Sequence, residues 1–298
     1  MVTRLPIQIK NMLALREHRM HHFFWHLVRE NWLIFDDDTK NSVRDIGWEP
    51  PRPSRDTTGP IENNNSGEDF LFMHRQMIIH VNNMLSQIGE PSYPKVEGWQ
   101  AVPAPGDLDY PVPPVWNTVP DSIRSSKTDE YYNNKMVNWE KDYTNLDILR
   151  QLTLGELGSK LEYTIHNAMH RRWASMPIGI RPPTSPDDID IIWDEPSYDY
   201  LADTYSSHVN DIFWKLHGWI DNRIEDWKKA HKITGDVPWS VQWDRNMIPH
   251  HNIVHTMNSM SIVEKSSQQN LGEMAKVTKI ISKTKVFPSF EVFDNDLP

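Results

Sequence analysis

The chain has 298 residues, enough to bury a substantial core in one large domain or two smaller ones. Its formal net charge of −10 argues against general nucleic-acid binding, which requires a basic surface. The absence of cysteine excludes disulfides, thiolate metal sites and a cysteine nucleophile. No apolar stretch approaches the roughly 20 residues that span a bilayer, and the first residues lack the pattern of a signal peptide. We therefore expect a soluble, cytoplasmic protein with neither a membrane nor a nucleic acid as partner.

The first half of the chain alternates predicted helices with proline-rich loops. Apolar residues at three- and four-residue steps predict a helix over 6–31. The polar, Pro- and Gly-rich segment 36–66 is predicted as a loop. A second helix is predicted over 67–89, with Gly89 as its C-terminal stop. The Pro-rich segment 90–120 carries aromatic residues, which favours a loop packed on a core over a disordered linker.

The second half continues this alternation. Helical patterns cover about 145–173 and 199–232, with a Pro- and Asp-rich loop at 176–197 between them. Beyond them we expect one helix near 251–275 and a C-terminal tail, 276–298, whose end, KTKVFPSFEVFDNDLP, has strand-like alternation. Because βαβ units are absent, the sequence predicts one mainly α domain spanning the chain, with long loops and a few short strands.

The histidines of these helices form a regular pattern. Two pairs are spaced four residues apart, so each pair projects from one helix face and can bind one metal ion. Each pair is combined with a lone histidine on a different apolar helix. The resulting sets are His22, His26 and His74, and His166, His170 and His217. They predict a dinuclear metal centre inside an antiparallel four-helix bundle.

The ligand types narrow the choice of metal. All-imidazole ligation suits copper and also zinc. The Glu-x-x-His pairs of di-iron bundles and the HExxH of zinc proteases are missing. The competing interpretation is that the histidines are core or surface groups with ordinary hydrogen-bond partners.

Four motifs resemble the copper-binding segments of arthropod haemocyanins and prophenoloxidases. They are HHFFWHLV (21–28), GEDFLFMHRQM (67–77), IHNAMH (165–170) and NDIFWKLHGWIDN (210–222). The HN dipeptide and the FW-x-LH context are also similar to tyrosinases. The resemblance implies a type 3 dicopper protein whose six ligands are the histidines of the two sets.

The resemblance also implies a reaction. It predicts two copper ions, with O2 as co-substrate, in a monooxygenase or oxidase of the tyrosinase or catechol oxidase type. The substrate would be a phenol, aminophenol or related aromatic small molecule, used in biosynthesis. The alternatives are a reversible O2-binding, haemocyanin-like protein and a dicopper oxygenase acting on a non-phenolic substrate. A homo-oligomer and a copper-delivery partner are both compatible with these functions.

Two catalytic residues follow from the tyrosinase pattern. Asn167 matches the Asn that, with an upstream Glu, holds a water that deprotonates the phenol. Glu162, one turn before His166, is the expected Glu, and Glu156 further upstream is the alternative. The competing role for Glu162 is to orient an imidazole or to face solvent.

Other residues near these motifs receive secondary predictions. Asp221 is expected to have a structural role, accepting hydrogen bonds that fix either its helix or an arginine, and His208 is expected to line the pocket. His251 and His255 have the spacing of a surface metal site but fit a loop and helix start better. One of three phenylalanines of the tail is a candidate to plug the copper pocket, with an edge strand as the alternative. These three are Phe287, Phe290 and Phe293.

Overall fold

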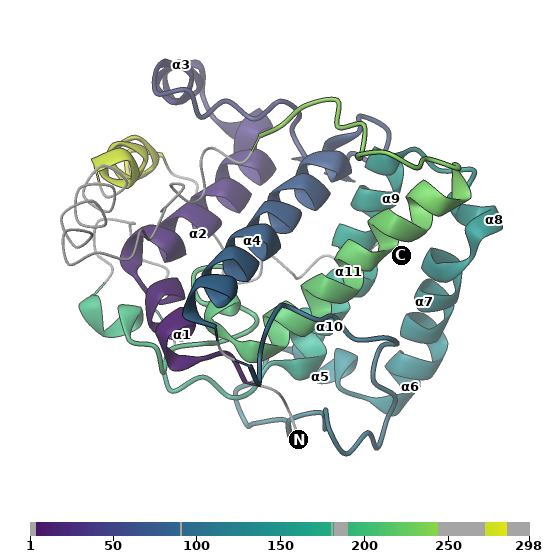
Figure 1. The fold of residues 1–298 in the computed structure, drawn as a ribbon. Coiled ribbons are helices and arrows are strands. Elements are labelled where there is room, and N and C mark those ends of the chain that lie inside the picture. The colour runs from purple at the N-terminus through teal and green to yellow at the C-terminus, as the bar shows by residue number, and fades with distance from the viewer. Residues whose placement is uncertain (1–3, 90, 180, 182–189, 244–271, 285–298) are drawn as a thin grey trace.

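The computed structural model describes residues 4–89, 91–179, 181, 190–243 and 272–284. This part of the chain is mainly helical, as predicted, and adds one short β-hairpin (Figure 1). Within these ranges, no helix combines the length and the apolar character needed to cross a bilayer.

The α-helices are α1 (Ile7–Leu13), α2 (Arg16–Asn31), α3 (Asp37–Asp45), α4 (Ser66–Ile88), α5 (Asp121–Ser126), α6 (Asp129–Tyr131), α7 (Val137–Thr144), α8 (Leu146–Leu149), α9 (Leu154–Leu161), α10 (Asn167–Trp173) and α11 (Asp211–Ala230). Two π-helical segments are η2 (Tyr132–Met136) and η3 (Glu162–His166). Short 3-10 turns are η1 (Trp32–Ile34), η5 (Ile191–Asp194) and η6 (Ser207–Val209). The hairpin strands are β1 (Arg55–Asp56) and β2 (Gly59–Pro60). A further helix covers 272–281.

The predicted helix over 6–31 is in fact two helices. The chain turns between α1 and α2, where Leu15 has the extended ψ of 140°. The Arg19 Nε donates a hydrogen bond of 2.8 Å to the Ala14 carbonyl oxygen, which satisfies a backbone acceptor at the break. The break lets each helix bury its own apolar face, a tertiary effect that periodicity does not encode.

The segment 36–66, predicted as a loop, also contains regular structure. The Asp36 side chain accepts from the Thr39 backbone N–H at 2.7 Å and so caps α3. The antiparallel pair β1–β2 follows, with Arg55 opposite Pro60. The few short strands that the sequence predicts are therefore represented by this hairpin.

Helix α4 matches its prediction closely. Glu68 and Asp69 lie in its first turn, where acidic side chains favour the helix dipole. Gly89 ends it in the left-handed conformation with φ of 68°, and its N–H bonds to the Leu85 carbonyl. The proline-rich stretch that follows packs on the core, since Trp99 is buried and its backbone N–H bonds to the Lys215 carbonyl of α11 at 3.1 Å.

The predicted helix over 145–173 is interrupted, and the one over 199–232 is shorter. A capping box of Thr153 and Glu156 starts α9, which continues through η3 into α10. Helix α11 begins only at Asp211, because the Asn210 side chain caps it and the preceding residues form turns. The stretch 121–144, which carried no prediction, forms α5, α6, η2 and α7.

Close backbone contact joins α4 to α9, which lie against each other (Figure 1). Gly67 of α4 faces Gly155 and Gly158 of α9, and a Cβ at any of the three would overlap the backbone of the neighbouring segment. Only glycine allows this approach. The contact fixes the spacing of two segments that carry histidines of the predicted centre.

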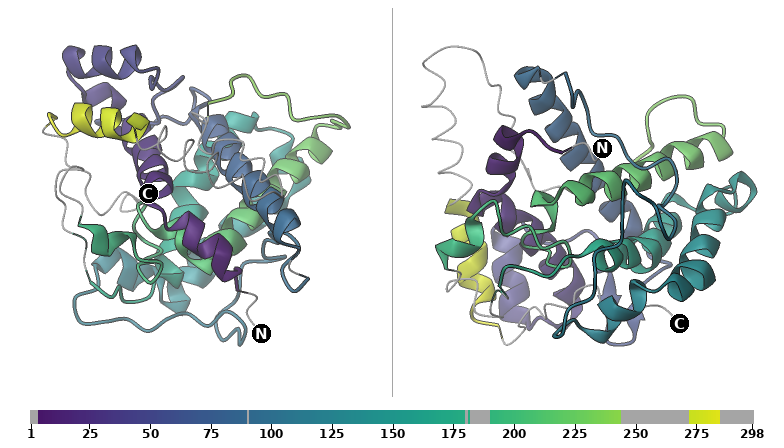
Figure 2. Two further views of the ribbon diagram at one scale, coloured as in Figure 1. Left: turned by 60° about the vertical axis from the view of Figure 1, so that its left-hand side comes forward. Right: turned by 90° about the horizontal axis from the view of Figure 1, so that it is seen from below.

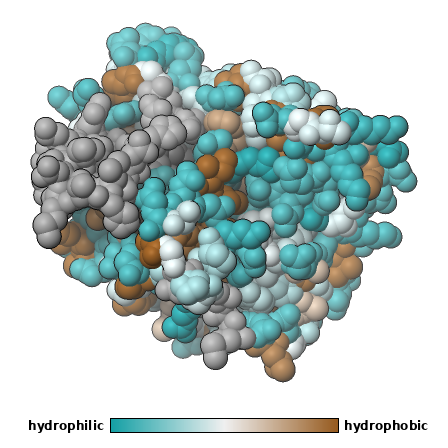
Figure 3. Space-filling view, viewed as in Figure 1, coloured by the Kyte–Doolittle hydropathy of each residue, from teal (hydrophilic) through white to brown (hydrophobic). Residues whose placement is uncertain are grey.

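Two hydrophobic clusters flank α2. One contains much of α4, α9, α10 and α11, and the other joins α2 to α3 and the helix over 272–281. That last helix lies beside α2 in Figure 2. Its Met274 and Val277 side chains are buried, and its Glu273 side chain accepts a hydrogen bond from the Trp48 indole N–H at 2.7 Å. The outer face in Figure 3 is mostly hydrophilic, with hydrophobic residues scattered over it. The predicted helix near 251–275 and the tail 276–298 lie mostly outside the described residues.

Candidate metal centre

Four separate segments bring the six predicted histidines together in the interior. They come from α2, α4, the continuous η3–α10 helix and α11. None of the six is more than 3% exposed. Polar side chains are rarely buried so completely unless their polar atoms form hydrogen bonds or coordinate a metal ion.

The first set forms a compact trio. The ring centroids of His22 and His26 are 4.9 Å apart, and those of His22 and His74 are 5.8 Å apart. One ring nitrogen from each of the three histidines lies within 4.8 Å of the others. A single metal ion can therefore be reached by all three imidazoles with small side-chain movements.

The second set adjoins the first. Its ring centroids are separated by 4.5 Å for His166 and His170, 5.0 Å for His166 and His217, and 5.3 Å for His170 and His217. The Nε2 atoms of His166 and His217 are 3.2 Å apart. His74 stacks on His217 at 4.4 Å, and its nitrogen also groups with those of His166 and His217. His74 thus lies between the two trios, whereas His170, predicted for the second trio, belongs to neither group of three ring nitrogens within 4.8 Å of one another among the described residues.

The Nδ1 atom of five of these histidines faces a backbone carbonyl oxygen. His74, His166 and His217 bond to the carbonyl four residues earlier in their own helices, at 2.9, 3.2 and 2.9 Å. His22 bonds to the Thr204 carbonyl at 2.6 Å, and His170 to the Leu201 carbonyl at 2.7 Å. A carbonyl only accepts, so each Nδ1 carries the proton and each Nε2 carries a lone pair. This is the tautomer that binds a metal through Nε2.

His26 is held differently. Its Nδ1 lies 3.5 Å from the Glu30 Oε1, one turn further along α2. The Glu30 side chain is only 9% exposed, and loss of hydration raises its pKa to about 8. His26 is therefore the one predicted ligand that faces a carboxylate instead of a backbone carbonyl.

Burial keeps the six imidazoles neutral. Loss of hydration lowers the pKa of His22 to about 4 and that of His166 to about 3. Burial also lowers the pKa of the other four well below the usual value, and neighbouring histidines add to the effect. Neutral imidazole is the form that binds metal ions.

Glu162 lies beside the centre but in an ion pair. Its two carboxylate oxygens accept from the Arg29 guanidinium at 2.5 and 2.9 Å. Burial raises the pKa of the Glu162 carboxyl, and the Arg29 charge opposes that shift. One carboxylate oxygen also lies within 4.8 Å of the ligand atoms of His26 and Glu30. The expected base is thus close to the histidines but already paired.

Asn167 is placed by the π-helical turn. The segment η3 ends at His166, and the His166 Nδ1 lies 3.1 Å from the Asn167 Oδ1 as well as near the Glu162 carbonyl. A π-turn inside a helix is often found at functional sites. Here it lets one imidazole N–H meet two acceptors, so Asn167 contributes to the orientation of His166.

Several aromatic side chains surround the trios, among them Phe70, whose ring lies 4.5 Å from that of His74, and Trp25, whose ring lies 5.0 Å from that of His26. The Phe213 ring lies 3.8 Å from that of His217 and 5.6 Å from that of His22. His208, predicted to line the pocket, has its ring 5.0 Å from His22, and its Nε2 donates to the Leu13 carbonyl at 3.1 Å. Phe213 carried no prediction. Its position four residues before His217, on the same helix face, could have indicated that its ring lies beside that imidazole.

Asp221 accepts from an arginine, as predicted. The Arg75 Nε donates to its Oδ1 at 2.6 Å, and the Arg75 Nη2 lies 3.2 Å from its Oδ2. Arg75 directly follows His74, and Asp221 lies one turn after His217. The pair therefore ties α4 to α11 beside the border between the trios.

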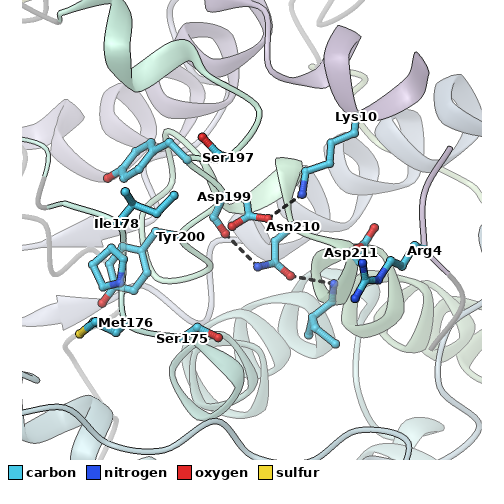
Figure 4. Close-up of a pocket in the computed structure, with 13 residues that line it drawn as sticks. Arg4, Lys10, Ser175, Met176, Ile178, Ser197, Asp199, Tyr200, Asn210 and Asp211 are labelled. Atoms are coloured by element: carbon cyan, nitrogen blue, oxygen red, sulfur yellow. Dashed lines mark hydrogen bonds and ion pairs between the residues drawn. The ribbon is translucent and has the colours of Figure 1, made fainter. Parts of the chain in front are cut away.

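A cavity of about 420 Å³ lies near the start of α11 (Figure 4). Its lining includes Met176, Tyr200 and Ile212, together with Lys10, which pairs with Asp199 at 2.7 Å. None of the six histidines lines it. The chain segment 197–200 forms one wall of the cavity. The next four residues include Leu201 and Thr204, whose carbonyl oxygens accept hydrogen bonds from His170 and His22.

Several predicted positions lie outside the described residues. These are His251, His255, Phe287, Phe290 and Phe293.

The chain was also compared with known proteins. No protein-family model matches it, and no curated protein is significantly similar to it.

Proposed function

We propose that the protein is a dicopper oxidoreductase that activates O2 to hydroxylate or oxidise a phenol, aminophenol or related aromatic small molecule. The observation that carries the proposal is the cluster of six buried imidazoles, in which His22, His26 and His74 form one group of close ring nitrogens and His74, His166 and His217 form a second. The histidine-bearing segments would act as a four-helix bundle around the metal pair.

The residues present fit copper. The Nε2 atoms of His22 and His74 are buried without a hydrogen-bond partner in the described part of the chain. A buried nitrogen lone pair of this kind is costly unless a ligand uses it. An all-imidazole donor set supports copper, and the absence of thiolates is compatible with it. When bound, the copper pair would supply the binding and reduction of O2.

The side chains and backbone of the protein would orient the ligands and shield the centre. The carbonyl contacts at Nδ1 hold each imidazole proton away from the metal side, and burial excludes water from the centre. In this proposal Asn167 orients His166. Two roles remain for Glu162: a base toward a phenol proton, as the resemblance predicts, or a partner that holds Arg29 and the η3 turn. The ion pair favours the second role because it stabilises the ionised carboxylate and weakens it as a base.

A second function, reversible O2 binding, is favoured by one observation. The six ligands are 1–3% exposed, which suits a molecule as small as O2 better than an aromatic ring. Turnover of a phenol requires the side chains around the centre, Phe213 among them, to move aside.

Copper titration of the metal-free protein tests the proposal. We expect about two copper ions per chain for the wild type. His74→Ala should lose tight binding at both positions, because the His74 nitrogen groups with ligand atoms of each trio. His231→Ala, outside both trios, is the matched control and should bind as the wild type does.

The loaded protein is then offered O2 with a monophenol, a catechol or no substrate. Oxygen consumption that depends on phenol or catechol supports the enzyme. Reversible O2 uptake without substrate consumption supports the carrier. A wild type that binds no copper would overturn both functions.

A further inference from the structure

One loop supplies a hydrogen-bond acceptor to each trio. The Thr204 carbonyl holds His22 of the first trio, and the Leu201 carbonyl holds His170 of the second. The Nδ1 partners of His74 and His217 are carbonyls of their own helices, which do not depend on this loop. The orientation of two of the six rings therefore depends on where a non-helical segment lies.

Asp203 fixes that segment from inside. It lies between the two carbonyl residues and is only 3% exposed. Its carboxylate oxygens accept from the Arg181 Nε and Nη2, both at 3.1 Å. It also accepts from the Tyr198 hydroxyl at 2.8 Å and from the Tyr205 backbone N–H at 3.0 Å. Four donors on one buried carboxylate leave it little freedom to move.

The arginine of this cluster also contacts α2 beside the first trio. The Arg181 guanidinium lies 5.2 Å from the ring centre of Phe23, the neighbour of His22, and 4.8 Å from that of Tyr205. Without the Asp203 charge, Arg181 would be a buried cation lacking its carboxylate. Such a group forces local rearrangement because its desolvation is no longer offset.

The outer side of the same loop has a separate attachment. The Lys10 Nζ pairs with Asp199 at 2.7 Å, and the Asn210 side-chain N–H donates to the Asp199 carbonyl at 2.8 Å (Figure 4). The Lys10 and Asp199 side chains are 22% and 36% exposed, so this ion pair is partly screened by water. Asp199 and Asp203 are thus two carboxylates of one loop, one at the surface and one in the interior.

We propose that Asp203 is a positioning residue for both trios at once. Through Arg181 and Tyr198 it holds the Leu201 and Thr204 carbonyls in place, and these carbonyls set the tautomer and ring orientation of His170 and His22. Among the hydrogen bonds described, Asp203 makes none to the six histidines. Its carboxylate is held by the four donors named above. Its hydrogen bonds act on both trios through the backbone of its loop, while its negative charge also acts on His22 through space.

Nitrogen NMR of the metal-free protein, labelled with 15N-histidine, provides the test. In the wild type at neutral pH, we expect the ring signals of His22, His74, His170 and His217 to show a protonated Nδ1 and a bare Nε2. In Asp203→Asn, the signals of His22 and His170 should shift or broaden together. Those of His74 and His217 should stay in place.

Two further variants keep the test decisive. Asp199→Asn makes the same substitution in the same loop but at the surface, and it should leave all four signals unchanged. Tyr198→Phe removes one donor to Asp203 and should move the same two signals by less, so it serves if Asp203→Asn does not fold. The proposal is overturned if the folded variants leave His22 and His170 unchanged, or if all four signals move alike.

The consequence for metal binding rests on the proposed function and has its own readout. Asp203→Asn should weaken binding of both copper ions by roughly 10- to 100-fold, since partners that orient ligating histidines typically have effects of that size. If the wild type binds no copper but the NMR pattern is as expected, the proposed function fails and the positioning role of Asp203 stands. If both copper ions bind as in the wild type and the NMR signals do not move, the positioning role is overturned.

Discussion

At the scale of single residues, the centre is defined by which nitrogen of each imidazole holds the proton. The backbone carbonyls that face Nδ1 leave Nε2 bare in a space from which water is excluded. A neutral, pre-oriented imidazole needs neither deprotonation nor rotation before it binds a metal ion. The same burial makes the folded protein less stable when the pH falls.

The metal-free protein should lose stability in mild acid. A buried neutral histidine has a folded-state pKa below its unfolded value of about 6.5. Its contribution to the stability of the fold is therefore complete only above about pH 6.5. This contribution is lost as the pH falls from about 6.5 toward the folded value, because the unfolded chain binds the proton first. For His22, with a pKa of about 4, and His166, with a pKa of about 3, the loss at pH 5 is about 2 kcal/mol each.

Urea unfolding at pH 7 and pH 5 measures this loss. We expect a lower midpoint at pH 5, and the difference should shrink in His22→Phe. Equal midpoints at the two pH values would show that the histidines are not buried as neutral groups.

The buried ion pair beside the centre gives a second residue-scale prediction. Glu162→Gln leaves the fully buried Arg29 guanidinium without its carboxylate and should lower the free energy of unfolding by about 3–5 kcal/mol. Glu225→Gln removes a carboxylate that pairs with Arg75 at 2.9 Å but is 54% exposed, and it should cost under about 1 kcal/mol. Similar small losses in both variants, measured by urea unfolding, would contradict the buried pairing.

Much of the residue scale could be read from the sequence, because four-residue spacing on a helix has a fixed geometric meaning. That spacing placed His22 with His26 and His166 with His170. The carbonyls of Leu201 and Thr204 could not be predicted, because every residue has a carbonyl and its direction depends on the loop. The Arg29–Glu162 pair joins positions 133 residues apart and also leaves no local pattern.

At the scale of elements, the centre depends on how closely α4 and α9 approach. Glycine at three facing positions permits direct backbone contact, and His74 and His166 lie further along the same two helical segments. The helices themselves were predictable from apolar periodicity. Their interruptions were not, because the break before α2 and the late start of α11 are set by tertiary packing and capping.

Gly158→Ala should disturb this contact. A methyl group there would overlap the Gly67 backbone, so the helices must separate. Overpacking of this kind should lower the free energy of unfolding by about 1–3 kcal/mol and weaken copper binding. Gly235→Ala, whose added methyl group meets open space, is the control. Thermal unfolding of the two variants should differ clearly; equal melting temperatures would contradict the close contact.

At the scale of the whole molecule, the helices that carry the histidines contribute to two hydrophobic clusters, α2 mainly to one and α4, α10 and α11 to the other. The predicted class, mainly helical with short strands, agrees with the described residues. The way α3 and the helix over 272–281 join the second cluster could not be predicted, since it depends on contacts such as that of Trp48 with Glu273, 225 residues apart.

Metal binding should stabilise the entire fold because its ligands come from both halves of the chain. A ligand that binds only the folded state adds about 4 kcal/mol at a free concentration 1,000 times its dissociation constant. We therefore expect copper to raise the melting temperature of the wild type by several degrees. His74→Ala should show little of this increase. An equal increase in both proteins would point to copper binding elsewhere.

The bonds from His22 to Thr204 and from His170 to Leu201 have a consequence for the order of events during synthesis. The first histidine of the centre is made early, but the carbonyl that orients it is made 182 residues later, and His217 later still. A nascent chain that ends after α4 carries three of the six predicted ligands and no loop to set the direction of the first. Under the proposed function, copper that arrived then would meet an incomplete ligand set in which His22 lacks its carbonyl partner, so we expect correct loading only after α11 has been synthesised.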